Sequence, residues 1–189
     1  MEYTDITLTD NVYEVQEEAR KAGLEDLIAI IPIDIVQNFP TFGTTASGTI
    51  SANEAIVTAS GAFTWKTGKK PTKLFCIIEK NSLESKLLNR STYETDVKVT
   101  IQNTAENQGF IENLRKIRFI AYLKKVEGDG MLLGKTGVTT GYLAHLKADS
   151  FSEKSGEKFN DDAMIELVIT AKPYRPYAYN ETFSFAAGV

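Results

Sequence analysis

The sequence has 189 residues, of which 42% are hydrophobic, 24% charged and 10% aromatic, a composition typical of one globular domain with a sizeable core. The formal net charge is −4, but it is unevenly distributed: residues 1–60 carry −8 and residues 61–189 carry +4. This asymmetry indicates charge complementarity, within one subunit or between subunits. It does not indicate the concentrated basic face of a tight nucleic-acid binder.

Cysteine usage and hydropathy exclude several classes of protein. The only cysteine, Cys76, excludes an internal disulfide and a cysteine-based zinc site, and its apolar surroundings predict a buried structural thiol. The first five residues are acidic and polar, so we expect no signal peptide. The longest apolar run, Leu27–Ile33, is too short to span a bilayer. We therefore expect a soluble protein made in a cytoplasm, with no membrane partner.

The first 40 residues are interpreted as an N-terminal helical arm followed by an edge strand. Asp10 can cap a helix that begins near Val12 and ends at Gly23. The almost continuous apolar run Leu27–Val36 predicts a strand. Because Pro32 cannot donate to a ladder, this strand should lie at a sheet edge or break at the proline, and it looks like sheet material without a partner in its own subunit.

Residues 41–189 are interpreted as a β-sandwich domain, which begins with a loop over 39–48. Residues 49–62 predict a strand, although the alanine-rich run 52–59 is also compatible with a helix. Phe63–Lys66 and Lys73–Glu79 predict a hairpin around the basic turn Thr67–Pro71. Asn81–Arg90 predicts a loop or a turn of helix.

The region from Tyr93 to Lys135 is the clearest in the chain. Residues 93–103 alternate, with Thr95, Val97, Val99 and Ile101 on one face, which is typical of a half-buried strand. The apolar spacing then becomes helical over residues 105–117. A strand is expected over Arg118–Lys125, followed by a turn into the short apolar run Met131–Leu133.

The last third predicts one long β-hairpin and an aromatic tail. Residues 142–172 form the hairpin, with Ser152–Asp161 as its tip and Ile165, Leu167 and Ile169 facing inward. The tail after residue 172 is rich in proline and aromatic residues, which commonly pack on a neighbour or add an edge strand. We nominate seven aromatic residues of the hairpin and tail as subunit-interface candidates: Phe151, Phe159, Tyr174, Tyr177, Tyr179, Phe183 and Phe185.

No motif predicts catalysis, a cofactor or a metal site. Gly134-Lys135-Thr136 lacks the upstream glycine of a phosphate-binding loop, so a glycine turn is the better interpretation. His145 is the only histidine and cannot anchor an ordinary metal site alone, and Asp161-Asp162 lies outside the ligand spacing of a calcium loop. We expect that the protein is not an enzyme.

The order of elements resembles the tail-tube subunits of tailed bacteriophages. The run from Thr92 to Tyr174 is similar to structural proteins of phages that infect Bacteroidetes: a helix carried by residues 107–114, then Phe-Ile-Ala-Tyr-Leu (119–123), Gly-Asp-Gly-Met-Leu-Leu-Gly (128–134) and Ile-Glu-Leu-Val-Ile-Thr (165–170). The resemblance is one of pattern over about the last hundred residues.

The resemblance implies a mainly β fold with a flanking helix, a β-sandwich or barrel of tail-tube type. It also implies that the subunit closes with copies of itself into a ring, commonly a hexamer, and stacks into a tube of the tail or head–tail connector. The partners would be other virion tail or connector proteins, with DNA as a non-specific passing cargo and the virion as the location. The alternative interpretation is a monomeric β-sandwich that binds a carbohydrate or a host surface protein through its aromatic residues.

Overall fold

The computed structural model describes residues 24–42, 59–77, 80–89, 92–125, 130–134, 143–147, 151–154, 163–172 and 176–179. The helix expected over 12–23 lies outside these ranges, as do most of the strand expected over 49–62 and most of the late hairpin's tip. The elements are β1 (Leu24–Pro32), a 3₁₀ turn η1 (Ile33–Ile35), β2 (Val36–Asn38), β3 (Thr41–Phe42), β4 (Ala59–Ser60), β5 (Thr64–Trp65), β6 (Thr72–Phe75), β7 (Ser82–Leu87), β8 (Tyr93–Gln102), α1 (Ala105–Leu114), β9 (Phe119–Lys125), β10 (Gly130–Leu133), β11 (His145–Leu146), β12 (Ser152–Lys154), β13 (Met164–Ala171) and β14 (Tyr177–Tyr179).

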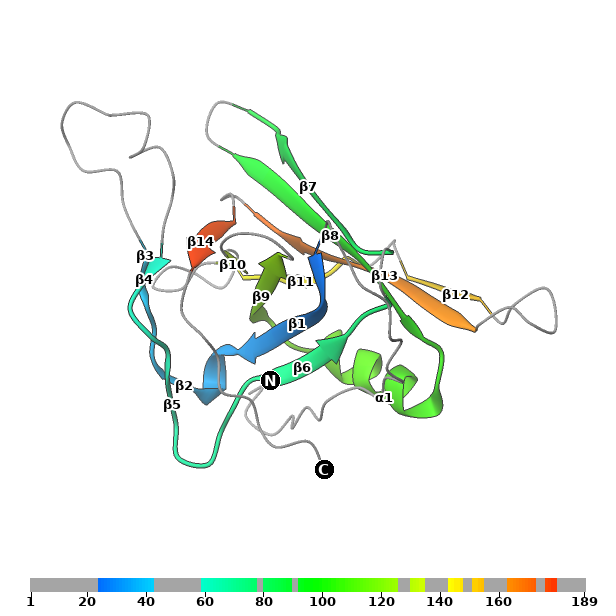
Figure 1. Cartoon of the computed structure of the whole chain (residues 1–189), viewed down its shortest axis with the longest axis horizontal. Helices are drawn as coiled ribbons and strands as arrows, with labels where there is room; N and C mark the ends of the chain where they lie inside the picture. Colours follow the sequence, from blue (N-terminus) through cyan, green and yellow to red (C-terminus); the bar gives the residue numbers. More distant parts are fainter. Residues whose placement is uncertain are drawn as a thin grey trace.

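Two larger antiparallel sheets make up most of the described chain (Figure 1). Sheet 1 has the strand order β14-β10-β9-β1-β6, and sheet 2 has the order β11-β13-β8-β7, with β12 also paired to β13. Neither sheet closes into a barrel. The mainly β fold predicted from the sequence is confirmed in this form.

The main core lies where both sheets and the helix meet. On sheet 2, Val97, Val99 and Ile101 of β8 are buried and face the same core as Ile165, Leu167 and Ile169 of β13. The alternation of these two strands therefore confirms the predicted inner faces. Ile28 and Ile30 of β1, Leu74 of β6 and Cys76 complete this core from sheet 1, and Cys76 is a buried thiol as predicted.

Helix α1 connects the two sheets, because it joins the end of β8 to β9. Thr104 is its N-cap and accepts a hydrogen bond from the Asn107 backbone N–H at 3.2 Å. The buried Asn107 side chain donates to the Gln102 carbonyl at 2.9 Å, so its burial is compensated. Phe110, Ile111 and Leu114 enter the main core, which confirms the predicted helix.

Sheet 1 is buried on its second face as well. Ile31, Ile120, Leu132, Tyr177 and Tyr179 form a second core with Val36 and Phe63. Consecutive residues of β1 therefore point into different cores. This two-sided burial explains why β1 is almost continuously apolar.

The prediction that β1 is an unpartnered edge strand is wrong. β1 lies between β6 and β9 and pairs antiparallel with both. The predicted break at Pro32 is confirmed, since Pro32 ends β1, opposite Phe119, and η1 follows. A proline at the last position of a strand removes a donor only where the ladder stops, so it does not exclude a central strand.

The predicted hairpin between Phe63–Lys66 and Lys73–Glu79 is also wrong. β5 pairs with β2, and β6 pairs with β1. The register continues from Val36↔Trp65 to Phe42↔Ala59, so β2–β3 and β4–β5 pair along one antiparallel arm. These paired segments, residues 36–42 and 59–65, are called the arm hairpin and come between the neighbouring strands β1 and β6 in the chain (Figure 1).

The segment expected to be a loop or helical turn at Asn81–Arg90 contains strand β7. Its six residues pair with β8 from Ser82↔Lys98 to Leu87↔Tyr93. Serine, glutamate and lysine have little preference for strands, and β7 buries almost no side chain that would mark it as one. Pairing with the strong strand β8 determines its conformation.

The antiparallel pairing of the late hairpin is confirmed, but one of its sides is divided. The predicted start of its tip at Ser152 is wrong, because Ser152–Lys154 forms strand β12. β11 and β12 both pair antiparallel with β13, in different registers. Just before β11, Ala144 exchanges both backbone hydrogen bonds with Phe119, which ties this side of sheet 2 to the start of β9.

Candidate assembly surfaces

The edges of the two sheets differ in strand direction. Within the described residues, sheet 2 has β7 at one edge and β11 with β12 at the other, and every neighbouring pair is antiparallel. Because sheet 2 has four strand positions, three antiparallel steps separate its edges, and β7 runs opposite to β11 and β12. Sheet 1 has five positions, so its edge strands β14 and β6 run in the same direction. A second copy can therefore continue sheet 2 head to tail with antiparallel pairing, the more favourable kind.

β7 is an edge strand with features that limit non-specific pairing. All of its side chains are exposed except that of Leu83, which is half-buried. Lys86 and Glu84 form an exposed ion pair at 3.3 Å on its surface. Charged residues on an edge suppress indiscriminate pairing while leaving the backbone available to a matched partner.

An exposed pair of leucines lies at the end of the β7–β8 hairpin. Leu87 is 57% exposed and Leu88 is 51% exposed. The hairpin is closed by the Leu88 N–H, which donates to the Thr92 carbonyl at 2.8 Å, and by the Thr92 N–H, which donates to the Asn89 side chain. These leucines are not among the interface residues predicted from the sequence, where the available signal is two adjacent leucines within an otherwise polar run.

The structure divides the seven nominated interface residues. Phe151, just before β12, is 41% exposed and is available to a partner. Tyr177 and Tyr179 are each only 2% exposed because β14 pairs with β10 and turns both rings into the second core. Their nomination is therefore wrong: the aromatic strand finds its partner within its own chain. Phe159, Tyr174, Phe183 and Phe185 lie outside the described residues.

Tyr179 also connects the C-terminal strand to the arm hairpin. Its hydroxyl donates to the Gly61 carbonyl at 3.2 Å. Its ring meets Phe63 and Tyr122 edge-on at 5.8 Å and 6.0 Å. Phe63 in turn stacks on Trp65 at 5.4 Å with nearly parallel planes. The stacked faces of Phe63 and Trp65 are occupied by one another, so this cluster fixes the base of the arm hairpin.

The outer face of sheet 2 carries a network of ion pairs. Lys147 contacts Asp96 at 2.8 Å and Glu94 at 3.7 Å, and Lys172 contacts Glu94 at 2.8 Å. The hydrogen bond from Lys172 is the main cause that lowers the pKa of Glu94. Burial opposes ionisation of Asp96, but the hydrogen bond and charge of Lys147 outweigh it and lower its pKa. The acidic and basic groups are thus paired across β8, β13 and the segment after β11.

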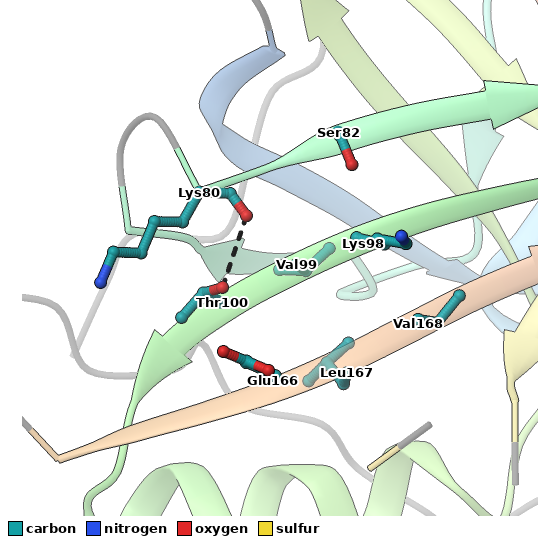
Figure 2. Close-up of a pocket in the computed structure, with 8 residues that line it drawn as sticks. All are labelled: Lys80, Ser82, Lys98, Val99, Thr100, Glu166, Leu167 and Val168. Atoms are coloured by element: carbon teal, nitrogen blue, oxygen red, sulfur yellow. Dashed lines mark hydrogen bonds between the residues drawn. The ribbon is translucent and has the colours of Figure 1, made fainter. Parts of the chain in front are cut away.

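A surface hollow of about 430 Å³ lies beside this network (Figure 2). Its lining comes from β8, β13 and the start of β7: Lys80, Ser82, Lys98, Val99, Thr100, Glu166, Leu167 and Val168. The Thr100 hydroxyl donates to the Lys80 carbonyl at 3.4 Å, which closes one side. Charges of both signs line the hollow, so it is better suited to contacts with a polar protein surface than to capture of one strongly charged ligand.

His145 and Gly134, which the sequence analysis considered for a metal site and a phosphate-binding loop, both contact neighbouring protein groups. The His145 Nδ1 atom lies 3.0 Å from the Arg118 guanidinium, at the edge of sheet 2. Gly134 has φ 103°, a conformation that favours glycine, and packs against the backbone of Ala144 and Phe119; Lys135 and Thr136 lie outside the described residues. Among the residues that the structure describes, no group of three or more His, Cys, Asp or Glu is placed to hold a metal ion.

Comparison with protein-family models, with curated proteins and with solved structures found no match to this chain. Across the described ranges, no helix has both the length and the apolar character needed to cross a membrane.

Proposed function

We propose that this chain is a structural subunit of a tailed-phage virion. Copies associate head to tail through sheet 2 into a ring, and the rings stack into a tube of the tail or head–tail connector through which DNA passes. The observation that carries the proposal is the opposite direction of the two edges of sheet 2, which allows β7 of one copy to extend the β12 part of the opposite edge of the next, beyond the segment that Ala144 ties to Phe119. A head-to-tail contact of this kind closes into a ring when its rotation allows.

The resemblance to tail-tube subunits supports the same conclusion. The sequence runs that carry the resemblance lie in α1, β9, β10 and β13. These elements belong to the two sheets and the helix between them, so the resemblance concerns the core of the fold. The exposed leucines beside β7 add apolar area to the proposed contact. Burial of Leu87 and Leu88 would favour association at roughly 25 cal/mol per Å² of apolar surface removed from water.

Cross-linking between opposite edges tests the proposal. Ser82 of β7 and Ser152 of β12 are both exposed, and the native Cys76 is buried, so cysteines introduced at the two serines can be labelled selectively. We expect the double variant Ser82→Cys/Ser152→Cys, treated with a short bis-maleimide, to give a ladder of dimers, trimers and higher species that ends at the subunit number of the ring. Denaturing electrophoresis measures the ladder, and negative-stain microscopy of the parent shows whether it forms rings or tubes.

Each single variant is the matched control, because one cysteine per chain can link at most two copies. A double variant that remains monomeric at high protein concentration and low salt would reject the proposal. A ladder that stops at a dimer in both the double and the single variants would indicate a two-fold contact, and would also reject a head-to-tail ring.

A further inference from the structure

Exposed apolar side chains gather at the two edges of sheet 2. Among the described residues, four large hydrophobic side chains are exposed: Phe39, Leu87, Leu88 and Phe151. Leu87 ends β7 and Leu88 follows it, whereas Phe151 lies just before β12 at the opposite edge. Phe39 is the least exposed of the four, and its ring meets Phe63 of its own chain edge-on at 6.2 Å. The other three are therefore divided between the two edges that the proposed ring brings together.

Leu87 and Phe151 belong to the same face of sheet 2. Leu87 is on the same side of β7 as Leu83, which packs against the main core, so it is on the inner face. On β12, Ser152 lies opposite Glu166, an exposed residue of the outer face. Phe151, one position earlier, falls on the inner face by the same alternation. When sheet 2 of one copy continues into sheet 2 of the next, inner face adjoins inner face, and the two side chains come to the same side.

One register of this antiparallel pairing places Leu87 of one copy directly opposite Phe151 of the next. A slip of two residues in either direction would instead place Phe151 opposite Ser85 or Asn89, which are both polar. A slip of one residue would put the side chains of one strand on the wrong face. Among these registers, only the first covers an apolar side chain at each edge with an apolar partner.

We propose that Leu87 of one copy packs against Phe151 of the next copy, and that this pair sets the register between neighbouring subunits. The inference rests on the proposed function for the head-to-tail contact, and adds the residue pair that aligns it. Directly opposite side chains on one face of an antiparallel pair have Cβ atoms about 4.5–5.5 Å apart. At that separation an aromatic ring and a leucine side chain cover one another from water.

The register also determines how far successive sheets are displaced along their strands. Within one copy, Ser152 lies opposite Glu166, and Glu166 lies opposite Thr100. Continuation of the β7–β8 pairing brings Lys80 opposite Thr100, whose hydroxyl donates to the Lys80 carbonyl at 3.4 Å. Between copies, Ser152 lies opposite Lys86, which is six residues after Lys80.

This displacement is compatible with a closed ring of sheets. Six residues at about 3.3 Å each span about 20 Å along the strands, and four strands at about 4.8 Å each span about 19 Å across them. The strands would then tilt by about 45° from the ring axis. Strands in closed barrels typically tilt by about 35–45°, so the register that pairs the apolar residues also allows closure.

Disulfide formation between two differently substituted copies tests the register in the full chain. One copy carries Lys86→Cys, the other carries Ser152→Cys and an affinity tag, and the native Cys76 is buried. Both substituted positions are exposed, and in the proposed register their Cα atoms are about 4.5–5.5 Å apart, within the range of a disulfide. We expect mild oxidation of the mixture to give a dimer of one tagged and one untagged copy, measured by denaturing electrophoresis.

The matched controls combine the same tagged copy with a cysteine at another position of the β7 edge. Glu84→Cys and Leu88→Cys report a slip of two residues in either direction, and Ser85→Cys reports a slip of one. We expect each control to form the mixed dimer at least about tenfold more slowly, because diagonal positions are about 7–8 Å apart and exceed disulfide reach. A control that forms the mixed dimer faster than Lys86→Cys would overturn the proposed register.

Replacement of the two apolar residues measures their contact. We expect Leu87→Ser and Phe151→Ser each to weaken association about three- to tenfold, because each removes apolar surface that the contact buries. The double variant should weaken association by less than the product of the two single effects, since both residues act on one contact. Phe39→Ser, the matched control, removes an exposed aromatic side chain away from the edges of sheet 2 and should leave association unchanged. Sedimentation velocity measures association, and single effects that multiply in the double variant would overturn the pairing.

The remaining outcomes separate this contact from the ring itself. A ladder in the edge cross-linking experiment, combined with faster disulfide formation in a control, leaves the ring standing and overturns the register. A Lys86–Ser152 dimer without a ladder supports the contact and rejects the closed ring. If neither the ladder nor any mixed dimer forms, the proposed function is rejected and the contact with it.

Discussion

Sheets 1 and 2 are both antiparallel, but they differ in how many of their faces are buried. In sheet 1, consecutive residues of β1 and β9, such as Ile30 with Ile31 and Phe119 with Ile120, are all buried. In sheet 2, buried Val97 and Val99 alternate with exposed Lys98 on β8. Val36 and Phe63 at the base of the arm hairpin cover the second face of sheet 1, whereas the outer face of sheet 2 carries ion pairs. Sheet 1 is therefore buried on both faces, and sheet 2 on one.

The largest effect that tests this comparison comes from substituting neighbouring residues in each sheet. We expect Ile30→Ala and Ile31→Ala in β1 each to lower the free energy of unfolding by about 2–5 kcal/mol, because each residue fills a different core. In β8, Val99→Ala should cost somewhat less, since it removes less volume, and Lys98→Ala should change stability by less than about 0.5 kcal/mol. Urea unfolding measures all four.

The decisive variant in this series is Ile31→Ala. If its cost approaches that of Lys98→Ala, the second face of sheet 1 is not packed. The comparison between the two sheets would then be wrong. An unchanged slope of the free energy against urea is needed for each variant, so that the shift in midpoint reports stability alone.

The fold was predictable from the sequence where burial is one-sided. Residues 93–102 and 164–171 alternate because only one face of sheet 2 is buried. The helical spacing over 105–117 predicts α1, which ends at Leu114. β1 was misplaced because a continuous apolar run cannot show which strands flank it. β7 was missed because its side chains are exposed and polar, so only its pairing with β8 marks it as a strand.

The candidate surfaces were less predictable. The aromatic residues near the end of the chain predict an interface, but aromatic content does not distinguish an interface from a core. Tyr177 and Tyr179 fill the second core because β10 offers them an edge that no local pattern reveals. The exposed pair Leu87 and Leu88 depends on where a hairpin turns, which is a property of pairing and not of composition.

A smaller effect comes from two glycines with opposite surroundings. A Cβ atom added at Gly130, in sheet 1, would overlap the ring of Tyr122, which is itself held edge-on by Tyr179. We expect Gly130→Ala to lower the free energy of unfolding by about 1–3 kcal/mol through overpacking. Gly109, in α1, has no heavy atom within 4 Å of the same added group. We expect Gly109→Ala to raise stability by about 0.5–1 kcal/mol.

Thermal and urea unfolding of these two variants sharpen the comparison between tightly packed sheet 1 and the open helix surface. A neutral Gly130→Ala would show that Tyr122 moves aside freely, and that the second core tolerates an added methyl group. A second substitution, Tyr122→Leu, should recover part of the loss in Gly130→Ala, because it removes the atoms that the new methyl group meets.

The smallest expected effect comes from His145, at the edge of sheet 2, and is measured as the pH dependence of stability. Burial and then the charge of Arg118 lower the pKa of His145, so the folded chain favours the neutral imidazole. Between the lowered pKa and the ordinary value near 6.5, the unfolded chain binds more protons than the folded chain, and stability therefore falls as the pH decreases. His145 is the only histidine.

We expect the urea midpoint of the parent to decrease between pH 7 and pH 5, and that of His145→Gln to change less over the same interval. Below about pH 4.5 the two should decline in parallel, because the lowered pKa values of Glu94 and Asp96 then determine the loss in both proteins. A parent midpoint that rises on acidification from pH 7 to pH 5 would show that His145 gains an acidic neighbour, and that this margin of sheet 2 is arranged differently.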